Sequence, residues 1–283
     1  MPNPPQITPT ELLDILRPHV QFRREAQFAW KSIVSSWAEI PLLRALWSAS
    51  SINFQATDRV RDLAGGGFHL TSNNTPLWGY QSATLIPVGQ FAASSSQYIS
   101  RTDAGGLGID WADIIGNEGH IISAQRGLTL GGWYLFETKA PTTSESLISK
   151  WNNTTNHRSY LIARMSGTTN SRFYISTNGV ATVSVTGPAL PADETWYFVV
   201  GRFDPSTALD IFVNPAYPSD YTQNAAGIPA TIYNSNASLV IMSRASLSWY
   251  CSGYWSIGFL SAGYLSDSII WQLFEQSRTM FNV

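Results

Sequence analysis

The sequence predicts a mainly β protein, an antiparallel β-sandwich with a helix at each end of the chain. From about residue 51, short apolar runs alternate with Gly, Asn and Pro breaks, and no long helical pattern separates them. Only 13% of the 283 residues are charged, about half of the share usual in globular chains. Ser, Thr, Asn, Gly and aromatic residues fill the difference. This composition is typical of β-rich domains.

Residues 1–50 are predicted to form a helical arm. Thr8, Pro9 and Glu11 form a capping box with proline at the first helical position, which predicts a short helix that Pro18 ends. A second helix should follow, because apolar residues recur at three- and four-residue spacing, and Pro41 should end or kink it. These residues are Phe22, Ala26, Ala29, Trp30, Ile33, Val34, Trp37 and Ile40.

The apolar face of this arm predicts an assembly interface with other copies or another protein. A cover over an open face of the chain's own sandwich explains the same pattern equally well, so both interpretations stay open. The run after Pro41 continues the apolar surface. The residues assigned to the interface are Phe22, Trp30, Ile33, Trp37, Leu43 and Trp47.

Residues 51–283 are predicted to form the sandwich. The dipeptide Asn178-Gly179 between two alternating runs is the strongest hairpin signal in the chain. Ser266 can cap a final helix with Ile269, Ile270 and Leu273 on one face. The predicted strands are residues 128–136, 146–151, 160–164, 172–177, 180–185, 196–203, 209–213, 239–244 and 254–260.

Charge and cysteine content exclude several classes of protein. The net charge of −2 comes without a basic run, so neither nucleic acid nor an anionic membrane is an expected partner. The single cysteine, Cys251, excludes an intrachain disulfide and a Cys-based metal site. The N-terminus lacks the features of a signal peptide, and no apolar run is long enough to span a membrane.

Several strand motifs resemble those of laminin G-like, concanavalin A-like jelly-roll domains. Leu128-Thr-Leu-Gly-Gly-Trp-Tyr is similar to the "Phe-Thr-Ile-x-x-Trp" strand of that family, and Leu209-Asp-Ile-Phe-Val-Asn to its "Leu-Tyr-Val-Asp-Gly" strand. Tyr264-Leu-Ser-Asp resembles the motif that leads into the terminal helix. The resemblance implies a jelly roll. Asn214-Pro215 replaces the usual Asp-Gly, so a calcium site is not carried over and no metal or cofactor is expected.

A helical arm without a leader, joined to such a domain, resembles structural proteins of phage particles, such as capsid decoration, tail or fibre proteins. The expected location is therefore the surface of a virion. The expected partners are capsid or tail subunits and further copies of the chain in a homo-oligomer.

No catalytic residues are predicted. Glycoside hydrolysis needs two carboxylates that flank the scissile bond, and the nearest acidic cluster, Asp110, Asp113 and Glu118, has helical spacing. The four histidines are scattered, so they do not form a zinc motif. A glycoside hydrolase is therefore the weakest of the functional alternatives.

Glycan binding is the alternative function, as a lectin-like module of a bacterial surface protein or on the particle itself. Sugars need aromatic rings beside hydrogen-bonding groups. Filling the core is the competing explanation for each tryptophan, and it is preferred for Trp133, Trp196 and Trp255. The candidates are Trp151 with Asn152 and Asn153, Trp249 and Tyr250 with Tyr254, Trp78 with Tyr80, and Trp111.

Overall fold

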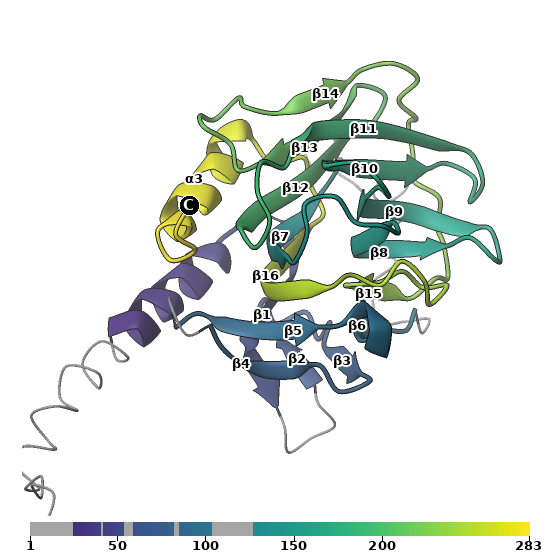
Figure 1. The fold of residues 1–283 in the computed structure, drawn as a ribbon. Coiled ribbons are helices and arrows are strands. Elements are labelled where there is room, and N and C mark those ends of the chain that lie inside the picture. Colours follow the sequence, from purple (N-terminus) through teal and green to yellow (C-terminus); the bar gives the residue numbers. More distant parts are fainter. Residues whose placement is uncertain (1–24, 41, 54–58, 82–84, 104–126) are drawn as a thin grey trace, which may run out of the picture.

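A computed structural model describes residues 25–40, 42–53, 59–81, 85–103 and 127–283 (Figure 1). The predicted helix after Thr8, the interface residue Phe22, the glycan candidate Trp111 and the acidic cluster around Asp113 lie outside the described residues.

The described chain forms one antiparallel sheet of 16 strands that curls into a sandwich, which confirms the predicted fold class. Neighbours along the sheet run in the order β11-β10-β9-β8-β15-β6-β3-β2-β1-β16-β7-β12-β13-β14, and β4-β5 attaches to β16. β11 contacts β13 and β14, so the two ends of the sheet meet. The strands are β1 (Leu43–Asn53), β2 (Arg59–Asp62), β3 (Leu70–Asn73), β4 (Leu77–Tyr80), β5 (Pro87–Phe91), β6 (Tyr98–Arg101), β7 (Leu128–Phe136), β8 (Glu145–Asn152), β9 (His157–Arg164), β10 (Asn170–Ser176), β11 (Thr182–Ala189), β12 (Trp196–Asp204), β13 (Ala208–Val213), β14 (Thr222–Asn224), β15 (Leu239–Ile241) and β16 (Gly253–Ser261).

The inner core lies between the two layers of the sandwich. Phe173 of β10 reaches across to Gly201 of β12, where an added Cβ atom would lie 2.7 Å from a carbon of the phenyl ring. Only glycine allows so close an approach of ring to backbone. Trp255 is fully buried in this core, as predicted.

A second core lies on the outer face of the sheet, under two helices (Figure 1). One helix covers residues 25–37. The other is α3 (Asp267–Arg278), and its cap is the predicted one: the Ser266 side chain accepts a hydrogen bond from the Ile269 amide. Trp133 stacks on Phe281 with ring centroids 4.1 Å apart. Trp133 and Trp196 are buried here, so their prediction as core residues is confirmed.

The predicted boundary between residues 50 and 51 falls inside a strand. β1 pairs with β16 on one side and with β2 on the other, so residues 43–50 belong to the sheet and not to a helical arm. Trp47 is fully buried in the inner core, and its indole N–H donates to the Phe68 carbonyl. Leu43 is half-buried against the second core. The helix at residues 25–37 is therefore followed by a strand from Leu43, and not by a second helical segment.

The arm residues that the structure describes pack on the chain's own sandwich. Trp30, Ile33 and Trp37 are all buried in the second core. The Trp37 ring meets Phe259 edge to face at 5.6 Å. Of the two interpretations of the arm, the described part therefore matches the intramolecular cover, and these three side chains are not available to a partner.

Candidate functional site

A groove of about 700 Å³ crosses the outer face of the sheet. Its floor is a row of directly opposed residues on four neighbouring strands: Leu77 of β4, Gln90 of β5, Tyr254 of β16 and Leu135 of β7. Because paired residues of neighbouring strands share a face, all four side chains point the same way. Val88 lines the groove and also belongs to the second core. We call this site the outer groove.

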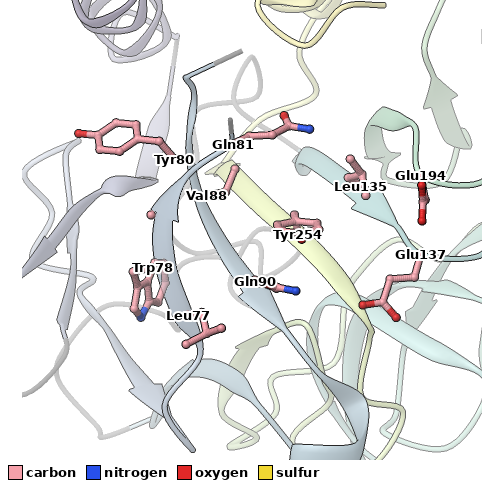
Figure 2. Close-up of a pocket in the computed structure, with 11 residues that line it drawn as sticks. Leu77, Trp78, Tyr80, Gln81, Val88, Gln90, Leu135, Glu137, Glu194 and Tyr254 are labelled. Atoms are coloured by element: carbon pink, nitrogen blue, oxygen red, sulfur yellow. The ribbon is translucent and has the colours of Figure 1, made fainter. Parts of the chain in front are cut away.

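The polar groups of the outer groove include amides, carboxylates and the phenols of Tyr80 and Tyr254. Figure 2 shows Tyr254 and Gln90 near its centre, with Glu137 and Glu194 together at one side. Glu194 is held in the turn before β12, where its amide donates to the Phe136 carbonyl at 2.8 Å. Gln81 accepts a hydrogen bond from the Trp196 indole at 2.8 Å.

This lining combines an aromatic and aliphatic floor with hydrogen-bonding groups at its edges. Such a combination suits a ligand with both apolar and hydroxyl-bearing faces. Among the described residues, the lining includes Glu137 and Glu194 and no Lys, Arg or His. An uncharged or cationic ligand is therefore favoured electrostatically over an anionic one.

The predicted candidates Trp78 and Tyr80 are among the residues that line the outer groove, but their rings do not form its floor. Side chains alternate along β4, so Trp78 faces the inner core, where it packs edge to face against Phe91 at 6.0 Å. Tyr80 is 59% exposed and points away from the groove in Figure 2. Tyr254 is the aromatic candidate that reaches the centre of the groove.

Gln90, Glu137 and Glu194 are functional candidates that the sequence analysis missed. No motif links them, since they lie on β5, after β7 and before β12. Only the strand pairing brings them together. The sequence signal that existed was the polar residue Gln90 inside the otherwise apolar and glycine-containing run of β5.

Trp151 and Trp249, far apart in sequence, meet in a small cluster on the other layer of the sandwich. Trp151 is only 5% exposed, and its indole N–H already donates to Asn153 at 2.7 Å. The Arg244 guanidinium lies 4.1 Å from the centre of the Trp249 ring and covers one of its faces. Both rings are already in contact with other side chains of the chain, so little of their surface is open to a ligand.

The two remaining candidates beside this cluster also make local contacts. The Asn152 side chain accepts from the Thr154 amide at 2.9 Å, which holds the turn after β8. Tyr250 packs against Tyr98, with ring centroids 6.1 Å apart.

Within residues 25–283, leaving out the undescribed segments, no group of three or more His, Cys, Asp or Glu side chains is placed to hold a metal ion. In the same residues, no helix has the length and apolar character needed to cross a membrane.

No protein-family model matches the sequence, and no curated protein matches it. Solved structures do match the fold. The binding domain of botulinum neurotoxin DC in complex with SialylT has a TM-score of 0.58 at 10% identity and covers 83% of this chain. The same domain with rat synaptotagmin II gives the same three values. Botulinum neurotoxin type C, which depends on interaction with two ganglioside molecules to enter cells, has a TM-score of 0.54 at 10% identity and covers 82% of this chain.

This chain spans only about half of each of these proteins, 51% in all three cases. At 10% identity the likeness concerns the fold. It shows that the chain has a β-rich fold like that of these structures.

Proposed function

We propose that this chain is a non-enzymatic carbohydrate-binding module, and that the outer groove holds an uncharged or amino-substituted sugar. The observation that carries the proposal is the row Leu77, Gln90, Tyr254 and Leu135, flanked by Glu137 and Glu194. A sugar ring could lie on the Tyr254 side of this floor, with its hydroxyl groups donating to the carboxylates.

The similar folds support a binding role, since they include a neurotoxin binding domain in complex with SialylT or with rat synaptotagmin II, and a neurotoxin whose cell entry depends on two ganglioside molecules. Their ligands are those of whole domains about twice as long as the matched part. The choice of sugar therefore follows from the lining of the groove in this chain, and not from those ligands.

A substitution at Gly79 can test whether the outer groove binds the glycan. It borders the outer groove, and a Cβ atom added to it meets nothing within 4 Å. Its position alternates with Trp78 and Tyr80, so a new side chain points to the groove face. The variant Gly79→Phe should therefore fill the groove and abolish binding on a glycan array while the thermal unfolding midpoint stays unchanged or rises slightly.

Val180→Phe is the matched control, because Val180 is 52% exposed in the turn between β10 and β11. It should leave binding intact. Gln90→Ala should weaken binding about three- to tenfold, the effect of one lost hydrogen bond. Binding that Gly79→Phe leaves unchanged would contradict the site, and a wild-type protein that binds no glycan would contradict the function.

The pair Glu137 and Glu194 also allows a direct test of the non-enzymatic assignment. Both carboxylates border one groove, which is the minimum that glycoside hydrolysis requires. The wild-type protein should release no reducing sugar from a glycan that it binds. Release that disappears in Glu137→Gln would instead establish a hydrolase.

We also propose that the module is displayed on the surface of a phage-like virion, with capsid or tail subunits and further copies of the chain as partners. The architecture, a helical segment joined to a jelly-roll domain, resembles that of phage structural proteins and supports this setting. Phe28, which is 73% exposed on the outer side of the helix at residues 25–37, is the contact residue offered for a partner. Antibody against the chain should label intact particles, and Phe28→Ser should reduce its incorporation. Unlabelled particles would contradict the setting.

A further inference from the structure

A second groove, of about 510 Å³, lies over β2, β3 and β6. Arg59, Thr71 and Ser100 face one another across these three strands, in direct register. His69 and Arg101 also line this groove, and their side chains supply further hydrogen-bond donors. We call this site the arginine groove.

The arginine groove is built from fixed hydrogen-bond donors. Arg101 is held by the Gly67 carbonyl at 2.8 Å and packs over the Phe68 ring at 5.5 Å. Its Nε atom is buried and has no hydrogen-bond partner among the described residues. Asn73 donates to the Ser100 hydroxyl oxygen at 3.0 Å, so the Ser100 proton is directed to another acceptor.

His69 is also a donor toward the groove. Its Nδ1 atom accepts the Asp62 amide proton at 3.0 Å. The neutral ring must therefore carry its proton on Nε2. Burial and the charge of Arg59 lower the pKa of His69, as expected where positive charges gather.

The carboxylate of Asp62 lies near the arginine groove but is not among the side chains that line it. Asp62 is 7% exposed and accepts backbone protons from Leu46, Ala64 and Phe68 at 2.9 to 3.1 Å. Among the residues that the structure describes, those that line the groove include two arginines and a histidine but no carboxylate. An anionic group would therefore find several donors and no like charge in this described lining.

We propose that the arginine groove binds one anionic substituent, a carboxylate or a sulfate, of an acidic polysaccharide. The cluster is compact, and its described lining holds no Phe, Tyr or Trp ring on which bases could stack, and the chain carries a net charge of −2. A nucleic acid would need an extended basic path with stacking rings. A single charged sugar fits the size of the cluster better.

This proposal concerns a different surface from the outer groove and does not depend on the function proposed for it. The test measures binding of three probes to the full chain by titration calorimetry: a polygalacturonate oligosaccharide, a heparin oligosaccharide and a single-stranded DNA oligonucleotide. The first two separate a carboxylate from a sulfate as the anionic group. We expect at least one of them to bind, more weakly at high salt.

Arg59→Glu should weaken that binding about tenfold, because a charge-assisted hydrogen bond is lost. Arg59 is exposed, and Arg59→Gln is the milder second variant should the charge reversal disturb folding. Lys31→Glu is the matched control, since Lys31 is exposed on the helix at residues 25–37 and gives the same change in net charge.

Three outcomes would overturn the proposal. These are no binding of either oligosaccharide, an equal loss of binding in Arg59→Glu and Lys31→Glu, or DNA binding as tight as that of the oligosaccharides. Gly79→Phe should leave binding of the acidic probes unchanged. A loss in that variant would show that they bind in the outer groove instead.

Discussion

Arg202 and Asp210 form an ion pair across β12 and β13 in which neither side chain is exposed to solvent. The Arg202 Nε–H donates to Asp210 at 2.8 Å. Arg202 also donates to the Leu265 carbonyl and to Asp267, at the start of α3. Burial lowers the pKa of Arg202, but Asp210 and Asp267 outweigh it, so this pKa lies above its usual value. One guanidinium therefore ties the last helix to the sheet.

Removing this guanidinium should be costly. Arg202→Leu leaves the Asp210 carboxylate buried without its charge partner, which is expected to lower the free energy of unfolding by about 3–5 kcal/mol. The double variant Arg202→Leu, Asp210→Leu should recover part of this loss, because no charge is then buried. Urea denaturation measures both variants. A double variant no more stable than Arg202→Leu alone would contradict this account.

Deleting residues 1–50 should prevent folding. The deletion removes most of β1, which pairs with both β16 and β2 in the middle of the sheet path. Deleting residues 1–42 leaves β1 in place, so the strand signal in circular dichroism should persist at lower stability because the second core loses Trp30, Ile33 and Trp37. A folded, monomeric protein after deletion of residues 1–50 would contradict the assignment of β1 to the sandwich.

His69 should make stability depend on pH. Burial, with the charge of Arg59, lowers the pKa of His69 below its ordinary value of 6.5. The native state then binds fewer protons than the unfolded state, so the stabilisation is complete above pH 6.5 and declines as the pH falls. His69→Gln should show a smaller decline than the wild type when the two are compared by thermal unfolding at about pH 7.5 and pH 5. Equal declines would contradict the role of His69.

Cys251 should be inert in the native protein. Its thiol is buried, and burial together with Glu145 raises its pKa well above the usual range. Since only the thiolate reacts readily, Ellman's reagent should label it only after denaturant unfolds the chain. Rapid labelling of the native protein would show that the segment around Cys251 opens without global unfolding.

The second half of the chain could be predicted well from its sequence. The strand predicted at residues 128–136 is β7, and that at 196–203 lies within β12. Both are long apolar runs, and their type follows from composition alone. The predicted cap at Ser266 is confirmed by its hydrogen bond to the Ile269 amide.

The region before residue 102 was harder to predict because its strands are short and polar. β2 reads Arg-Val-Arg-Asp, which has no apolar run. The residues Leu42, Leu43, Leu46 and Trp47 have helical spacing, yet pairing with β16 makes this segment a strand. Tertiary pairing outweighs local pattern in such segments.

The candidate site was only partly predictable for the same reason. Tyr254 could be recognised as an aromatic residue at a strand end. Its neighbours in the outer groove could not, since they come from pairings between strands remote in sequence.

The pairing of β1 with β16 also bears on how the protein folds. β1 and β16, the first and last strands in chain order among the described residues, are neighbours in the sheet. The helix at residues 25–37 packs on residues near the C-terminus, with the Trp30 and Phe281 rings 6.1 Å apart. Contacts of such large sequence separation form slowly. During synthesis, the edge of β1 that faces β16 and the helix at residues 25–37 lack these partners until β16 and Phe281 have left the ribosome. Their apolar side chains are then a target for chaperones and a source of aggregation.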